Sequence, residues 1–158
     1  MDREQALEIV NRYINNPQMV KHMLATEAVM RALARRFGED EDHWGLAGLL
    51  HDADAEIAAS EQQELVVPKP TGDGPAPVGK HSTMPAQGLL VPKLTQNVLD
   101  EESAAAIASH NPYTGIKPKG RMGWALYAAD PLTGLIVASA LVLPDKKLGG
   151  LTAQSVLK

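Results

Sequence analysis

Apolar residues recur every three or four positions through the N-terminal third of the chain, which is the spacing of one face of an α-helix. Alternation of apolar with polar residues, which marks a half-buried strand, is sparse, and only six residues are aromatic. The pattern therefore predicts an all-α fold. The chain of 158 residues is long enough to bury a substantial core, so we expect residues 1–158 to form a single domain.

Capping residues mark the ends of the N-terminal helices. We expect Asp2 to cap a first helix and Asn16, followed by Pro17, to begin a second. Short polar side chains accept backbone N–H bonds at helix starts, and proline is tolerated in the first helical turn. Gly38 indicates the end of the second helix, and the acidic run 39–42 predicts the start of a third.

The composition changes after the third helix. Proline and glycine are dense at about residues 66–80, which excludes a regular helix or a central strand and predicts a loop that could act as a lid. Shorter helices are expected at 83–90 and 101–110, before the turn-rich and basic residues 111–121.

A long apolar segment follows over residues 122–143, and Pro131 interrupts it. Proline lacks a backbone N–H and disfavours the helical conformation in the residue before it. We therefore expect a kink in this helix, or a break with Asp130 capping the second half.

The chain has no cysteine, so a metal site can use only nitrogen and oxygen ligands, and this composition suits a reducing cytoplasm. The first residues are charged where a secretory signal would be apolar, and the longest apolar stretch, 135–143, is too short to span a bilayer. We expect a soluble cytoplasmic protein without a membrane partner. The net charge of −4 argues against binding of long nucleic acid but permits a small phosphorylated substrate. The oligomeric state is not indicated.

Two adjacent polar residues, His51 and Asp52, end the third apolar run. At a helix end an imidazole and a carboxylate can converge on one metal ion, but such a site needs further ligands. His22 lies at the edge of the apolar stripe of the second helix and is expected to face the core. Asp130 lies in a still more apolar segment, where an unpaired carboxylate is costly, so a cation or several donors should lie near it.

The order of these residues, His22, His51-Asp52 and Asp130, resembles the H…HD…D pattern of the HD-domain metal-dependent phosphohydrolases. The segments GLLHD and LYAADPLTGL are similar to the two best-marked stretches of a bacterial branch of these hydrolases. The resemblance covers most of the chain, and it implies a helical bundle in which the four residues bind a metal ion. Members of the family usually continue further, so we expect a truncated C-terminus.

His81 and His110 extend the resemblance to the expanded pattern H…HD…H…H…D, whose additional histidines bind a second metal. The chain departs from that pattern in the proline-rich stretch before His81 and in Ala55, which stands where the family has a tyrosine. The alternative is that both histidines lie on the surface near loops.

Mixed imidazole and carboxylate ligands suit Mn, Fe, Co, Ni or Zn, as one ion or two, and such an ion lowers the pKa of bound water enough for attack on phosphorus. Asp52, Asp54 and Glu56 are the candidate catalytic residues. Asp54 and Glu56 match acidic positions of the same branch. They could orient the water, move protons or, as we rank first, support His22 from outside the ligand set. Solvent-exposed charges at a helix end are the alternative.

A basic cluster, Lys117, Lys119 and Arg121, stands between His110 and Asp130. These side chains are candidates to hold a substrate phosphate through charge-assisted hydrogen bonds. A solvated surface is the more frequent explanation for a cluster of this kind.

Three functions are consistent with these residues. The first, which we favour, is hydrolysis of a nucleotide or another small phosphoester through a metal-activated water. The second is oxidation by a two-iron site of the expanded type. The third is a non-catalytic module that binds a ligand and keeps a metal for stability.

Overall fold

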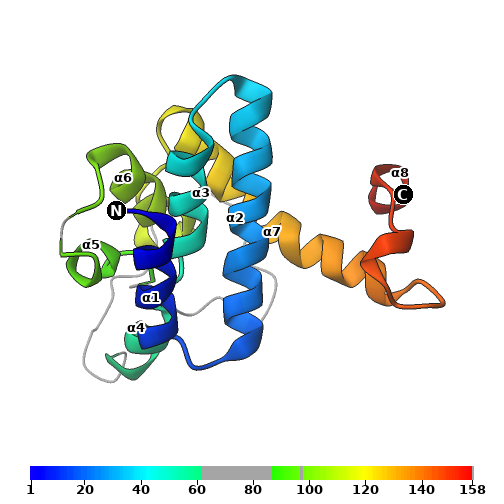
Figure 1. The fold of residues 1–158 in the computed structure, drawn as a ribbon, viewed down its shortest axis with the longest axis horizontal. Coiled ribbons are helices and arrows are strands. Elements are labelled where there is room, and N and C mark those ends of the chain that lie inside the picture. Colours follow the sequence, from blue (N-terminus) through cyan, green and yellow to red (C-terminus); the bar gives the residue numbers. More distant parts are fainter. Residues whose placement is uncertain (62–86, 97, 158) are drawn as a thin grey trace.

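The computed structural model describes residues 1–61, 87–96 and 98–157. Every regular element in these ranges is a helix, which confirms the all-α prediction (Figure 1). The α-helices are α1 Arg3–Tyr13, α2 Pro17–Phe37, α3 Glu41–Leu50, α4 Ala55–Glu61, α5 Val91–Leu94, α6 Glu101–His110, α7 Gly120–Leu141 and α8 Ala153–Val156. The 3₁₀ helices are η1 Pro112–Thr114 and η2 Leu148–Gly150. The loop predicted at 66–80 and His81 lie outside the described residues.

The N-terminal helices begin and end at the predicted residues. The Asp2 carboxylate accepts the Gln5 N–H at 2.9 Å, while the Gln5 side chain accepts the Asp2 N–H, and together they form a capping box at the start of α1. Asn16 caps α2 with Pro17 in its first turn, and Gly38 ends α2 in the left-handed conformation at φ +73°. These ends depend on neighbouring residues alone, which is why the sequence predicts them.

The helix predicted at 83–90 is wrong over its described part. Residues 87–90 form a turn, and the short helix α5 begins only at Val91. The backbone N–H groups of Gly88 and Leu90 donate to the carboxylate of Asp54 instead of to helical carbonyls. Gly88 also has φ +88°, a left-handed conformation that interrupts a helix.

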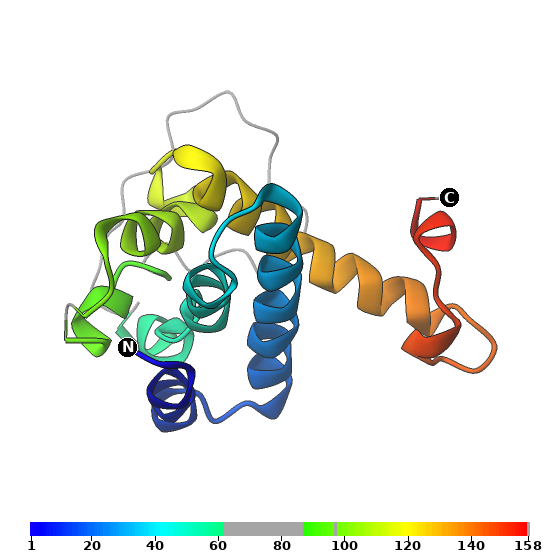
Figure 2. The same ribbon diagram turned by 45° about the horizontal axis from the view of Figure 1, so that its top comes forward.

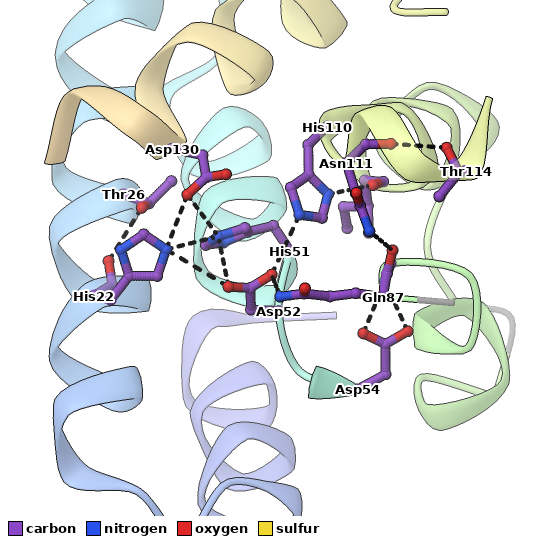
Figure 3. Close-up of polar contacts among 12 residues, drawn as sticks. His22, Thr26, His51, Asp52, Asp54, Gln87, His110, Asn111, Thr114 and Asp130 are labelled. Atoms are coloured by element: carbon purple, nitrogen blue, oxygen red, sulfur yellow. Dashed lines mark hydrogen bonds and ion pairs between the residues drawn. The ribbon is translucent and has the colours of Figure 1, made fainter. Parts of the chain in front are cut away.

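Helix α7 is continuous through Pro131, so of the two expected alternatives the break is wrong, and the kink stays a prediction. Because Pro131 has no N–H, the carbonyl of Tyr127 cannot receive the usual helical bond from it. The Thr133 hydroxyl donates to the carbonyl of Asp130 at 2.8 Å. The Asp130 side chain is turned toward other helices and caps nothing (Figure 3).

One core lies between α2, α3, α6 and α7, and α1 covers α3. The N-terminal half of α7 packs in this bundle, whereas its C-terminal half extends away from it toward η2 and α8 (Figures 1 and 2). The largest fully buried apolar side chains of the core are Met23, Met30, Leu49, Leu50, Ile107, Met122 and Leu126.

Gly48 allows α3 to approach α2 closely. A Cβ atom at this position would lie 2.9 Å from the carbonyl oxygen of Thr26 and 3.0 Å from the Cα of Glu27. Both neighbours are backbone atoms of α2, which cannot move independently of that helix. The contact therefore sets the distance between the helix that carries His22 and the helix that ends at His51.

Replacing Gly48 with alanine is expected to destabilise the fold by about 1–3 kcal/mol, because the two helices must separate to admit the methyl group. Urea unfolding measures the change. Gly134 is the matched control, since it is also inside a helix but a methyl group there would meet no atom within 4 Å. Gly134→Ala should leave the free energy of unfolding unchanged from that of the wild type or raise it by up to about 1 kcal/mol. Equal stability of Gly48→Ala and the wild type would contradict the prediction.

Candidate metal centre

Five polar side chains from the bundle converge on one region (Figure 3). His22 comes from α2, His51 is the residue that ends α3, and Asp52 follows it directly. His110 is the last residue of α6, and Asp130 lies on α7. The structure thus brings together the four residues predicted as ligands of the first metal and adds His110, one of the two proposed for a second.

The polar atoms of these side chains lie at hydrogen-bonding distance from one another. His22 Nε2 is 3.1 Å from Asp130 Oδ1 and also 3.1 Å from His51 Nε2. Asp52 lies between the rings, with Oδ2 at 3.3 Å from His51 Nε2 and Oδ1 at 3.2 Å from His110 Nε2. The cluster is therefore compact, with nitrogen and oxygen atoms only.

Backbone carbonyls determine which nitrogen of two of these rings carries a proton. His51 Nδ1 lies 2.8 Å from the carbonyl oxygen of Gly48, and His110 Nδ1 bonds the carbonyl oxygen of Ile107 in the same way. A carbonyl only accepts, so each Nδ1 must donate its N–H. Both acceptors belong to the last turn of a helix, where carbonyls lack intrahelical partners. Each Nε2 therefore faces the cluster and offers a lone pair whenever its ring is neutral.

The Thr133 hydroxyl determines in a similar way which nitrogen of His22 bonds outside the cluster. Its Oγ1 lies 3.0 Å from His22 Nδ1, and its single hydroxyl proton is donated to the carbonyl of Asp130. The hydroxyl must then accept from His22 Nδ1–H, which leaves Nε2 as the ligating atom. Thr133 is not among the residues predicted for the site. Its position three residues after Asp130 on a helix, and so on the same face, is the signal that could have identified it.

Replacing Thr133 with valine is expected to weaken metal binding about 10–100-fold, the usual effect of losing a group that orients a ligating histidine. Valine has the same shape but cannot accept from His22 Nδ1–H. Competition with a chromophoric chelator measures the affinity. Thr133→Ser keeps the hydroxyl and should bind metal nearly as the wild type does. A serine variant as weak as the valine variant would show that packing, and not the hydrogen bond, is responsible.

The carboxylates and imidazoles of the cluster favour each other's charged forms. Burial opposes a charge on His22, but hydrogen bonds to Asp130 and Asp52 outweigh it and raise its pKa to about 9. Burial likewise opposes ionisation of Asp52, yet His51 and His110 hold the Asp52 pKa well below its ordinary value. Without a metal, the cluster is therefore held together by a proton on an imidazole between anionic carboxylates.

Metal affinity is expected to rise with pH up to about 9 and then level off, because the proton on His22 must leave before Nε2 can bind a metal. Stability of the metal-free fold should change in the opposite sense. Because folding raises the His22 pKa, the protonated ring stabilises the folded state in full at pH values below its ordinary pKa of 6.5. This stabilisation is lost as the pH rises through about 9. Calorimetric titrations with metal in buffers of different ionisation enthalpy measure both affinity and released protons. Affinity that is constant between pH 6 and pH 9 would contradict this.

The residues present fit a divalent transition metal. Two groups of side chains have ligand atoms within 4.8 Å of one another: His22, His51 and Asp130, and His51, Asp52 and His110. Imidazole nitrogen with carboxylate oxygen suits Mn, Fe, Co, Ni or Zn. The groups share His51, so the arrangement can hold one ion or two adjacent ions. His81, the other ligand predicted for a second metal, lies outside the described residues.

Asp54 and Glu56, predicted to act in or near the site, are both engaged by backbone groups. The buried carboxylate of Asp54 accepts the N–H groups of Gly88 and Leu90 at 2.8–2.9 Å, and burial raises its pKa. Glu56 accepts the N–H groups of Asn15 and Asn16, each at 2.8 Å, and so holds the link that precedes α2. These bonds hold backbone segments near the site and do not reach His22, so the predicted support of His22 stays a prediction. Their direct participation in catalysis stays a prediction.

Gln87 is a further member of the site and is not among the predicted residues. Its side-chain amide donates to Oδ1 of Asp52, the oxygen that also faces His110 (Figure 3). The turn at residues 87–90, which Asp54 holds, places Gln87 there. No sequence motif marks a glutamine in this role, because the contact depends on a turn that closes over residues distant in the chain.

The basic cluster does not join the metal ligands. Arg121 lies at the start of α7, about 13 Å along the helix axis from Asp130, and pairs with Glu39 at 3.0 Å. Lys117 and Lys119 are exposed on the segment before α7. Their predicted contact with a substrate phosphate stays a prediction.

In a comparison with protein families, the model of the HD domain matches residues 19–140. Comparisons with curated proteins and with solved structures returned no match. The matched range is more than half of the chain, and it contains all five side chains that converge in the metal centre. The chain therefore belongs to the HD-domain family, whose members are in general metal-dependent hydrolases.

Proposed function

We propose that this protein is a metal-dependent phosphohydrolase that acts on a nucleotide or another small phosphoester. The observation that carries the proposal is the orientation of the rings, in which hydrogen bonds at Nδ1 turn the Nε2 atoms of three imidazoles toward one another and toward two carboxylates. When bound there, a divalent transition metal lowers the pKa of water enough to supply a nucleophile near neutral pH. Membership of the HD-domain family supports the same reaction class.

The burial of the ligands indicates the side from which a substrate arrives. The side chains of His51 and Asp52 are 0% and 6% exposed, whereas those of His22 and Asp130 are 26% and 32% exposed. The centre therefore opens between α2 and α7. We place the phosphoryl group on that side, with the buried His51 and Asp52 forming the closed side of the site.

A survey of phosphate release tests the proposal. Purified protein is loaded separately with Mn²⁺, Fe²⁺, Co²⁺, Ni²⁺ and Zn²⁺ and assayed on nucleoside mono-, di- and triphosphates and on simple phosphoesters. We expect release with at least one metal, absent after chelation and absent in Asp52→Ala. Asp42→Ala is the matched control, since that carboxylate is 87% exposed and pairs with Arg31. Metal-loaded protein that releases phosphate from no substrate would count against the function.

A two-iron oxidative enzyme is the second candidate, because His51, Asp52 and His110 form a second ligand group beside the first. Metal analysis of protein purified without oxygen distinguishes the two. Two iron ions per chain with the Mössbauer signature of a coupled pair would favour the oxidative enzyme. One ion of another metal per chain would exclude it.

The proposal includes a small phosphorylated substrate in place of a long nucleic acid, and a cytoplasmic location. The net charge of −4 and the exposed positions of Lys117 and Lys119 support the first part. If these lysines hold the phosphate, alanine at both positions should raise KM with little change in kcat. The absence of cysteine supports the second part.

A further inference from the structure

The turn at residues 87–90 is fixed against the end of helix α6. The carboxylate of Asp54 accepts two N–H groups of this turn at 2.8–2.9 Å. Gly88 packs so closely on α6 that a Cβ atom there would lie 2.7 Å from the carbonyl oxygen of Ile107. The side chain of Gln87 therefore reaches the metal centre from a backbone whose position is set by these contacts.

Gln87 binds one of the two oxygens of the Asp52 carboxylate. Its side-chain amide donates to Oδ1 (Figure 3). An ionised carboxylate only accepts, so the NH₂ group of the amide, and not its oxygen, faces Asp52. Oδ1 also lies 3.2 Å from His110 Nε2, whereas Oδ2 lies 3.3 Å from His51 Nε2 and 3.5 Å from His22 Nε2. The two oxygens of Asp52 thus face the two ligand groups of the centre, and Gln87 binds the oxygen that faces the second group.

His51 belongs to both ligand groups but can bind only one ion. Its Nδ1 donates to the carbonyl of Gly48 at 2.8 Å, so Nε2 is its one possible ligand atom, with a single lone pair when the ring is neutral. An ion in the first group takes that lone pair. Among the His, Asp and Glu side chains that the structure describes, the second group then keeps only Asp52 and His110. Catalytic zinc sites, by comparison, usually have three protein ligands.

We propose that Gln87 restricts the centre to one metal ion. The inference rests on the metal centre of the proposed function but not on its reaction. A second ion, which in two-metal sites lies about 3.5–4 Å from the first, would need Asp52 to bridge the pair with one oxygen on each ion. The hydrogen bond from Gln87 to Oδ1 is charge-assisted and would have to be given up. The amide hydrogens also carry partial positive charge, so they oppose a second cation beside this oxygen.

Gln87→Glu reverses each of these effects. The side chain keeps its length and shape, but it loses the N–H group that binds Oδ1 of Asp52. It offers a carboxylate oxygen as a third ligand beside Asp52 and His110, and carboxylate with imidazole suits the same transition metals as the first group. Its negative charge also offsets the repulsion between two divalent ions. We therefore expect this one substitution to convert a one-ion centre into a two-ion centre.

Metal content tests the proposal. Each protein is dialysed without oxygen against an excess of Mn²⁺ or Fe²⁺, freed of loosely bound ions and analysed by plasma mass spectrometry. The wild type should hold one ion per chain and Gln87→Glu two. Gln87→His offers an imidazole at the same position and should also hold two, so the test does not depend on the folding of one variant. Leu89→Glu is the matched control, since it adds a carboxylate to the same turn at a residue that is 41% exposed, and it should hold one ion.

Electron paramagnetic resonance of the Mn²⁺-loaded proteins is a second readout, because an isolated ion and a spin-coupled pair give different hyperfine patterns. We expect the isolated pattern in the wild type and the coupled pattern in Gln87→Glu. Two ions per wild-type chain, one ion in both folded variants of Gln87, or a second ion in Leu89→Glu would each overturn the inference. A wild type that binds no metal would instead overturn the proposed function on which the inference rests.

Discussion

Asp52→Asn is expected to abolish tight metal binding, lowering affinity by more than the roughly 100-fold that loss of a ligand-orienting group costs. The asparagine has the same shape, so the change removes charge and leaves packing intact. Asp52 is the only side chain of the described centre that contacts all three imidazoles, through Oδ2 to His22 and His51 and through Oδ1 to His110. Isothermal titration with Mn²⁺ or Zn²⁺, together with the metal content of purified protein, measures the loss.

Asp42→Asn is the matched control for this prediction. That carboxylate belongs to a surface ion pair with Arg31, so its removal should leave metal affinity unchanged and alter stability by less than about 1 kcal/mol. If the Asp52 variant retained the metal content of the wild type, Asp52 would not be a ligand, and the assignment of the centre would have to move to His22, His51 and Asp130.

Removal of metal is expected to lower the melting temperature by about 5 to 10 °C relative to protein saturated at one hundred times Kd. Binding to the folded state alone contributes about 2.7 kcal/mol at that concentration. In a protein of this size one kcal/mol corresponds to about 2 to 4 °C. Differential scanning calorimetry with added Mn²⁺ or Zn²⁺, and then with a chelator, measures the shift.

The shift should be absent in Asp52→Asn, which separates binding at the centre from unspecific effects of the ions. Calcium should stabilise less than the transition metals, because it prefers an all-oxygen ligand set. A melting temperature that is indifferent to metal and chelator in the wild type would mean that the five side chains bind one another and no ion.

The helices whose boundaries depend on neighbouring residues could be predicted from the sequence. Asp2 and Asn16 accept N–H groups two or three positions later, and Gly38 needs only its own left-handed conformation. That these polar side chains need partners in the core could also be predicted, because His51 and Asp52 follow an apolar run and Asp130 lies within one. A polar group in such a position must find a partner, and here the partners are one another.

Features that depend on contacts between distant residues could not be predicted. The turn at residues 87–90 replaces a helix because Asp54 accepts its N–H groups from more than thirty positions away. Helix α7 remains continuous through Pro131 although the local rule favours an interruption, and packing of its N-terminal half in the bundle accompanies this continuity. Gln87 and Thr133 acquire their roles only when the fold places them beside Asp52 and His22.

The hydrogen bond between His22 and Thr133 joins residues 111 positions apart. During synthesis, His22, His51 and Asp52 leave the ribosome long before Asp130 and Thr133 are made. A nascent chain therefore offers two histidines and one carboxylate without the groups that complete and orient them. We therefore expect tight metal binding only after α7 has been translated and has packed, and a chain that stalls before this helix should hold an ion only weakly.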